Sequence, residues 1–136
     1  MNFLLDVNAL VAWGWTDHQH HLRMDHWMSS LLTSEADLVF TNPIGELGFV
    51  RVSVLRNPKV TDVRTAGSKL AELLKFVGPK HRFLPDDLSS CREFPDWCTH
   101  AKHTTDSHLL ALAQKHKLQL ATLDTGIPGA FVIPEF

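Results

Sequence analysis

The fold is decided by residues 3–10, which read Phe3-Leu4-Leu5-Asp6-Val7-Asn8-Ala9-Leu10. A short apolar run ends in a carboxylate, Asp6, and an amide, Asn8, follows two residues later. The run is continuous rather than alternating, which is typical of a strand whose sheet is covered on both faces. A carboxylate beside such a strand is costly to bury unless a positive charge compensates it. The stretch therefore predicts a buried strand with a polar site at its carboxyl end.

Further acidic residues lie beside apolar segments downstream, and they are Glu46, Asp106 and Asp124. Taken singly, each acid has a plain structural explanation. An Asp after a strand is often a turn residue, and an acid in a first helical turn complements the helix dipole. Four acids in such places together suggest that they share a cation.

Apolar segments alternate with segments of helical spacing along the chain. The strands are expected at residues 2–7, 37–41, 81–85, 118–123 and 131–133. This alternation predicts an α/β sandwich with a mainly parallel sheet. Ligands of such sheets bind beyond the carboxyl ends of the strands, where Asp6 and Asp124 are expected. Glu46 and Asp106, in the first turns of helices, are expected at the same edge.

The spacing of apolar residues also predicts the buried faces of the helices. Asp17 is the expected cap of the second helix, and Asn42 or Thr41 that of the third, with Pro43 at its first position. The residues expected to face inward on the second helix are Leu22, Trp27, Leu31 and Leu32. Those expected to face inward on the third helix are Ile44, Leu47, Val50 and Val54. Residues 88–100 are expected to form a short helix or a loop, because Pro95 interrupts them.

Composition limits the class of protein. A chain of 136 residues is expected to form one domain with its own core. No apolar stretch approaches the roughly 20 residues that cross a bilayer. The start lacks the basic and apolar regions of a signal peptide, so a cytoplasmic location is the default expectation. Two cysteines, Cys91 and Cys98, are too few for a disulfide framework.

A net charge of −2 does not indicate a general nucleic-acid binder, which normally carries a basic surplus. A cluster of four acids would, however, mask a modest basic rim around it. Net charge is therefore a poor test for a nuclease with an acidic centre.

The acids make chemical sense as ligands of a hard divalent cation such as Mg²⁺, which prefers carboxylate oxygens. Such a cation lowers the pKa of a bound water and neutralises charge on phosphate oxygens. Asn8 is a candidate to hydrogen-bond a carboxylate or a metal-bound water. Thr105 is a candidate donor to a phosphate, and Arg51 a candidate phosphate contact through its charge. Helix capping for Thr105 and simple solvation for Arg51 are the alternative explanations.

Four motifs in this order resemble the PIN domain, and in particular the VapC-type toxins of bacterial toxin–antitoxin pairs. The motifs are Leu5-Asp6-Val7-Asn8-Ala9-Leu10, Glu46-Leu47-Gly48-Phe49-Val50-Arg51, Thr105-Asp106-Ser107-His108-Leu109-Leu110-Ala111-Leu112-Ala113 and Leu120-Ala121-Thr122-Leu123-Asp124. The resemblance covers essentially the whole chain. It implies that residues 1–136 form a single PIN domain, a three-layer α/β/α sandwich with a mainly parallel central sheet of about five strands.

The resemblance also implies a function, a metal-dependent endoribonuclease that cuts RNA without a covalent intermediate. Asp6, Asp106 and Asp124 would be direct or water-mediated ligands of Mg²⁺ or Mn²⁺. Glu46 would complete the catalytic acids and help to position the attacking water. The family implies a homodimer and a cognate antitoxin whose tail covers the acidic pocket. The family often has another polar residue after the fourth acid, and Thr125 at that place puts a ligand role there in doubt.

Several alternatives stay open or are disfavoured. A stand-alone PIN nuclease and a PIN-like RNA-binding module without cleavage both fit the motifs. A phosphatase of the haloacid dehalogenase kind is disfavoured, because it needs a second Asp where this chain has Asn8. A receiver domain is disfavoured, because Glu46 lies in a helical pattern rather than at the end of a middle strand.

Other residues give weaker indications of a functional role. The histidines between His18 and His26 are expected at a solvated helix start, although imidazole is also a good metal ligand. Trp15 and Trp97 lie in less regular segments than the other tryptophans and are candidates for substrate or antitoxin contact. His108 is expected to point away from the site, since it lies two residues beyond Asp106 on a helix. The pair Asp86-Asp87 is expected to form a turn.

Overall fold

The computed structural model describes residues 1–136. Its helices and strands alternate along most of the chain. In chain order they are β1 (Asn2–Leu5), α1 (Val7–Gly14), α2 (His21–Thr33), β2 (Leu38–Thr41), α3 (Pro43–Arg56), α4 (Val63–Val77), η1 (Gly78–Lys80), β3 (His81–Phe83), η2 (Ala101–His103), α5 (Thr104–Lys115), β4 (Gln119–Thr122) and β5 (Phe131–Val132). No helix is both long enough and apolar enough to cross a membrane.

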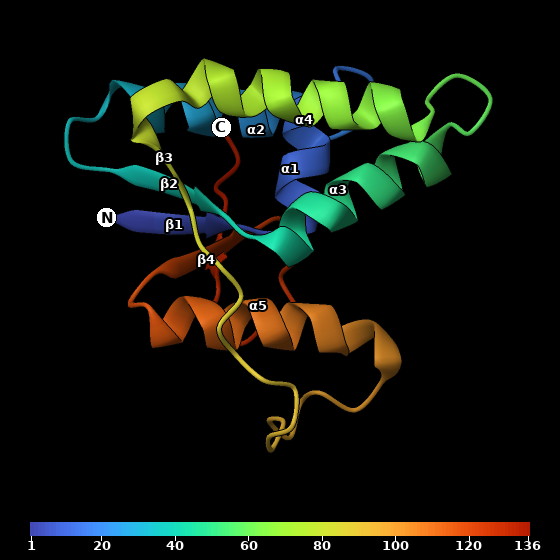
Figure 1. Ribbon diagram of the computed structural model, residues 1–136. Coiled ribbons are helices and arrows are strands. Elements are labelled where there is room, and N and C mark those ends of the chain that lie inside the picture. Colours follow the sequence, from blue (N-terminus) through green and yellow to red (C-terminus); the bar gives the residue numbers. More distant parts are fainter.

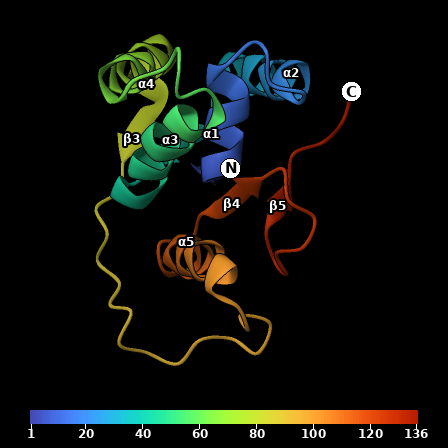
Figure 2. The same cartoon turned by 90° about the vertical axis from the view of Figure 1, so that its right-hand side faces the viewer.

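A five-stranded sheet lies at the centre of the molecule, in the order β3-β2-β1-β4-β5, and every pair in it is parallel. Helices α1 to α4 lie on one side of the sheet and α5 on the other, as Figures 1 and 2 show. The prediction of a three-layer α/β/α sandwich with a parallel sheet of about five strands is therefore confirmed. Because β1 is the middle strand, residues that follow it sit at the centre of the sheet's carboxyl edge.

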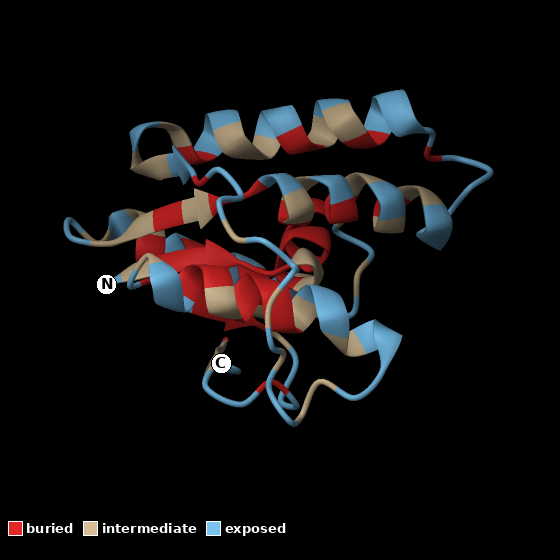
Figure 3. Ribbon diagram, turned by 60° about the horizontal axis from the view of Figure 1, so that its bottom comes forward, coloured by how far each residue is buried: buried red, intermediate tan, exposed pale blue.

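The two faces of strand β1 pack into the two hydrophobic cores of the molecule, which explains the continuous apolar sequence of the strand. Phe3 and Leu5 belong to the larger core cluster, which lies under α1 and α2. Leu4 points the opposite way and belongs to the smaller cluster with the leucines of α5. The buried residues form a band through the centre of the molecule in Figure 3. The expected strand of residues 2–7 ends at Leu5, because Asp6 already caps helix α1 and its Oδ1 accepts a hydrogen bond from Val7 N.

The start of α3 follows its predicted capping chemistry. The side chain of Asn42 accepts hydrogen bonds from Ile44 N and Gly45 N, and Pro43 occupies the first position of α3. The start of α2 was predicted wrongly. This helix begins at His21 rather than directly after Asp17, and its cap residue His20 makes no side-chain capping bond.

The later start changes which residues of α2 are buried. Leu22 is 70% exposed, so its predicted place in the core is wrong. The buried face consists of Met24, Trp27, Met28 and Leu31. This set recurs at intervals of three and four residues, so the helical period is present but rotated away from Leu22.

The predicted inward face of α3 is wrong at Leu47, whereas Ile44 and Val50 are half-buried and pack against the two core clusters. Leu47 is 70% exposed, whereas the buried residues of this helix are Gly45, Gly48, Phe49 and Ser53. The small residues let α3 approach α1 closely. A Cβ added at Gly48 would lie 2.6 Å from Val7 Cγ2. The apolar stripe that includes Leu47 lines a surface groove of about 590 Å³.

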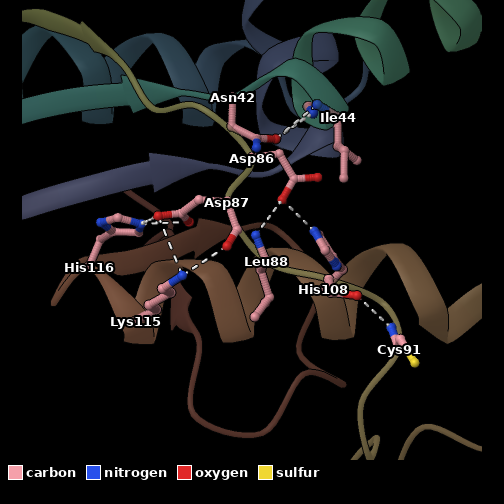
Figure 4. A network of polar contacts seen from close by, with 11 residues as sticks. Asn42, Ile44, Asp86, Asp87, Leu88, Cys91, His108, Lys115 and His116 are labelled. Carbon is pink, nitrogen blue, oxygen red and sulfur yellow. Dashed lines mark hydrogen bonds and ion pairs between the residues drawn. The ribbon is translucent and has the colours of Figure 1, made fainter.

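A segment without helix or strand, residues 84–100, passes from β3 to the far side of the sheet. Two acidic residues hold it against α5, as Figure 4 shows. Asp86 Oδ1 accepts a hydrogen bond from His108 Nε2 at 2.9 Å, and Asp87 accepts one from His116 Nε2 at 2.9 Å. Leu88 N also donates to Asp86 Oδ1 at 3.3 Å, but residues 84–89 do not form the expected turn. His108 thus faces this segment and does not line the cavity of the acids described next.

Candidate active site

Three of the four predicted acids line one cavity at the carboxyl edge of the sheet. Asp6 follows β1, Asp124 lies two residues beyond the end of β4, and Asp106 is in the first turn of α5. All three line a cavity of about 550 Å³, together with Asn8 and Thr105. Strands and a helix that are distant in sequence thus bring these side chains together.

Asp6 is the most constrained of the acids, with an exposure of only 2%. Its Oδ1 accepts a hydrogen bond from Val7 N at 2.7 Å, and its Oδ2 accepts one from Thr122 Oγ1 at 2.7 Å. Burial raises the pKa of Asp6, and the nearby Asp124 carboxylate raises it further, while these two hydrogen bonds lower it. The backbone and Thr122 therefore fix the direction of this carboxylate.

Thr122, at the end of β4, connects the acids to Asn8. Besides donating to Asp6, its Oγ1 accepts from Asn8 Nδ2 at 3.1 Å and from Asp124 N at 3.0 Å. Asn8 Oδ1 in turn accepts from Leu123 N at 3.1 Å. The sequence reasoning missed Thr122. The signal that could have found it is a hydroxyl at the end of a buried strand, two residues before Asp124.

Burial and the charges of the neighbouring carboxylates disfavour the ionised form of Asp106. Burial first, and then the charges of Asp6 and Asp124, raise the pKa of Asp106 from its usual 3.8 to about 6. Carboxylates that raise one another's pKa share a region of negative potential, which a cation would relieve. Their oxygens are the donors that hard divalent cations prefer, so the residue set fits such an ion. No three His, Cys, Asp or Glu side chains are already gathered in an arrangement that could hold one.

Glu46, the fourth predicted acid, does not line this cavity. Its Oε2 accepts a hydrogen bond from Thr41 Oγ1 at 2.6 Å. Thr41 Oγ1 also lies 2.7 Å from His81 Nε2, which must be the donor, since the Thr41 hydroxyl proton points to Glu46. Burial lowers the pKa of His81. Glu46 is thus in the first turn of α3 as expected, but its carboxylate is turned towards β2 and β3.

Basic side chains also line the acidic cavity. The lining includes Arg51 and Arg56 of α3, Lys102 before α5, and His18 of the α1–α2 connection. Arg56 is also 3.6 Å from Asp17. Burial, followed by the charge of Arg56, lowers the pKa of His18. A polyanion entering the cavity would therefore meet cations within reach of the acids.

The fold and the acidic cavity define this molecule as a PIN-like α/β protein. The crystal structure of VapBC2 from Rickettsia felis bound to a DNA fragment from its promoter has a similar fold. It matches with a TM-score of 0.59 and 15% identity, over 97% of each chain. No protein-family model matches the sequence.

Curated relatives give a closer comparison. Ribonuclease VapC38 of Mycobacterium tuberculosis is 41% identical over 128 residues, which span 91% of this chain and 86% of the relative. Ribonuclease VapC39 of the same species is 34% identical over 134 residues, 93% of this chain and 91% of the relative. Ribonuclease VapC29 is 31% identical over 127 residues, 93% of this chain and 89% of the relative. The chain belongs to the VapC ribonuclease family, which confirms the resemblance seen in its motifs.

Proposed function

We propose that this protein is an endoribonuclease that depends on a divalent metal ion and hydrolyses phosphodiester bonds of RNA. The observation that carries the proposal is the single cavity lined by Asp6, Asp106 and Asp124 together with basic side chains. Relatives named ribonucleases cover most of the chain, which supports the same activity.

Asp6, Asp106 and Asp124 would hold the metal ion, either Mg²⁺ or Mn²⁺. A bound ion of this kind supplies an acidic water as nucleophile and neutralises charge that develops on the phosphate. The raised pKa of Asp106 supports the assignment, because a cation would favour the ionised form that burial and the charges of Asp6 and Asp124 now disfavour.

The remaining residues of the site would orient and hold the reacting groups. Thr122 fixes the direction of the Asp6 carboxylate, and Asn8 fixes Thr122. Arg51 and Lys102, which line the cavity, would bind phosphates of the RNA. Thr105, exposed on the first turn of α5, is positioned to donate to a phosphate oxygen.

Glu46 remains a proposed member of the catalytic acids. Its helix belongs to the same edge of the sheet, and its motif matches the family pattern. In the structure its carboxylate is bound to Thr41 rather than to a group in the cavity. A role in positioning water requires its side chain to leave Thr41.

We also propose that the protein is the toxin of a toxin–antitoxin pair, a homodimer of single PIN domains (residues 1–136) that acts in the cytoplasm. The family of ribonucleases to which it belongs supports this role. The similar fold in a VapBC2 structure supports an antitoxin as partner. On this view the antitoxin restrains the nuclease until RNA cleavage is needed.

Sequencing of RNA 5′ ends after a brief pulse of expression tests the function. New 5′ ends should appear with the wild-type protein and be absent with Asp6→Asn, which keeps the size of the side chain. Asp25→Asn, a change at an exposed acid of α2, is the control and should cut like the wild type. Expression alone should arrest growth, and Asp106→Ala should relieve the arrest. Normal growth with abundant folded wild-type protein, together with new 5′ ends, would favour a stand-alone nuclease.

A further inference from the structure

A second, smaller cavity opens directly beside the acids. It has a volume of about 330 Å³ and is lined by Trp97, Lys102, His103, Asp106, Asp124 and Gly126. Three of these residues, Lys102, Asp106 and Asp124, also line the larger acidic cavity. The two cavities therefore meet at the carboxylates proposed to hold the metal ion.

Aromatic rings distinguish the smaller cavity from the larger one. The ring centroids of Trp97 and His103 are 6.2 Å apart, and the planes are tilted by 52°. Trp97 also packs against the smaller core cluster, so its indole has a fixed support behind it. A ring that is held on one side and lines a cavity on another is suited to stacking.

His103 places its imidazole ring beside Trp97 in the lining of this cavity. Its Nδ1 is buried and has no hydrogen-bond partner. Its ring is 5.4 Å from that of His100, centroid to centroid, at an angle of 63°. A group in the cavity would contact the rest of the imidazole ring, since the buried Nδ1 is closed to it.

These groups match the chemistry of one nucleotide. A nucleobase offers a π-face for Trp97 and polar edge atoms for His103, and its phosphate suits the Lys102 ammonium. Lys102 lies on both cavities, so a phosphate bound there places the neighbouring base within reach of Trp97 and His103. A base that is paired and stacked in a duplex cannot present its face in this way.

We propose that the cavity formed by Trp97, Lys102 and His103 binds an unpaired nucleobase next to the scissile phosphate of single-stranded or looped RNA. This inference rests on the proposed ribonuclease function and deepens it, because it assigns residues that select the substrate. The protein then distinguishes single strands from duplexes, and one base from another, at the position next to the cut.

Binding to short single-stranded RNA tests the proposal in the Asp6→Asn protein, whose changed residue lies outside the smaller cavity. The RNA is fluorescently labelled, and its dissociation constant is measured by anisotropy. Trp97→Ala should weaken binding about tenfold, since stacking of one base contributes on this order. Trp97→Phe keeps an aromatic face and should lose no more than about threefold. Phe83→Ala, at an exposed aromatic of β3 on the far edge of the sheet, is the matched control.

A second readout uses the active protein on a pool of RNAs randomised around the cut site. His103→Ala should change the base preference beside the cut, while Phe83→Ala should leave it as in the wild type. Far-ultraviolet circular dichroism and urea unfolding verify that each variant is folded.

The outcomes separate this proposal from the proposed function. If the wild type cuts RNA but Trp97→Ala and His103→Ala bind and cut like Phe83→Ala, the base subsite is wrong and the nuclease stands. If Trp97→Ala loses only antitoxin binding, the cavity is a contact site for the antitoxin, and the proposed base subsite is again wrong. If the wild type neither binds nor cuts RNA, both proposals fail.

Discussion

At the scale of single residues, Thr122 has a central place in the hydrogen bonding of the acidic site. Its hydroxyl is fully buried and joins Asp6, Asn8 and the backbone of Asp124. It therefore fixes the direction of the Asp6 carboxylate and the course of the backbone before Asp124. A buried hydroxyl with several partners stabilises the fold and orients the site at once.

Thr122→Val should lower the free energy of unfolding by about 1–3 kcal/mol, because it leaves buried donors and an acceptor unpaired while keeping the side-chain shape. It should also slow RNA cleavage, since Asp6 loses a partner that fixes it. Thr122→Ser retains the hydroxyl and should keep most of the activity. Urea unfolding and initial cleavage rates measure both effects. Equal rates for the Val and Ser variants would contradict the positioning role.

The acids also predict a pH dependence of the metal-free protein. Between the usual pKa of 3.8 and about 6, the folded protein binds more protons at Asp106 than the unfolded chain does. Protonation of Asp106 thus favours folding at low pH, and this stabilisation is lost as the pH rises through about 6. Asp6 has a raised pKa as well and acts in the same direction.

Asp106→Asn should therefore stabilise the protein at pH 7 in the presence of a chelator. The expected gain is about 1–2 kcal/mol, because water reaches this partly exposed carboxyl and screens some of the repulsion. Thermal unfolding at pH 5 and pH 7 checks the prediction, and the gain should be smaller at pH 5 than at pH 7, since the loss of stability begins near the usual pKa of 3.8. A variant that is less stable than the wild type at pH 7 would show that Asp106 is not repelled by its neighbours.

Individual residues of the site were only partly predictable. The carboxyl-edge positions of Asp6, Asp106 and Asp124 follow from the pattern of strands and helices, because parallel strands end together. The rotation of Glu46 towards Thr41 was not predictable, since it depends on His81, which lies far away in sequence and beside Thr41 only in the folded sheet.

At the scale of elements, helix α3 shows how glycine decides which face is buried. Its apolar residues recur at helical spacing, yet Gly45 and Gly48 face the interior and Leu47 faces solvent. The helix approaches α1 closely, and this approach is possible only over small residues. A reading based on hydrophobicity alone selects the wrong face, because glycine contributes space rather than apolar area.

Two glycine substitutions should have opposite effects. Gly48→Ala places a Cβ 2.6 Å from Val7 Cγ2 and should destabilise the protein by about 1–3 kcal/mol. Gly67→Ala, in α4, meets no atom within 4 Å and should stabilise it by up to about 1 kcal/mol, since alanine favours helices. Chemical unfolding of both variants measures the contrast. Equal effects of the two changes would contradict the close packing of α3 on α1.

At the scale of the whole molecule, the sheet is covered by two separate cores, and residues 84–100 connect the layers. The predicted sandwich with a mainly parallel sheet was correct because a continuous apolar strand and alternating elements indicate the same α/β arrangement. The course of residues 84–100 was not predictable, since it depends on pairs such as Asp86 with His108 that span the fold.

Asp86→Ala should loosen this segment, because it leaves the buried His108 Nε2 without its acceptor. The expected loss is about 1–3 kcal/mol in the free energy of unfolding, with faster proteolysis within residues 88–100. Limited proteolysis with mass spectrometry locates the cuts. Asp96→Ala, at an exposed acid of the same segment that forms no ion pair, is the control and should be cut at the wild-type rate.

The central claim is that Asp6, Asp106 and Asp124 together hold a divalent ion that makes RNA cleavage possible. The most direct test is the initial rate of cleavage of a labelled single-stranded RNA by the purified protein, titrated with Mg²⁺ or Mn²⁺ from a chelated start. We expect a rate that rises to saturation with metal for the wild type. We expect a loss of about a hundredfold or more for each of Asp6→Asn, Asp106→Asn and Asp124→Asn. Undiminished cleavage with excess chelator, or by any of these three folded variants, would contradict the account.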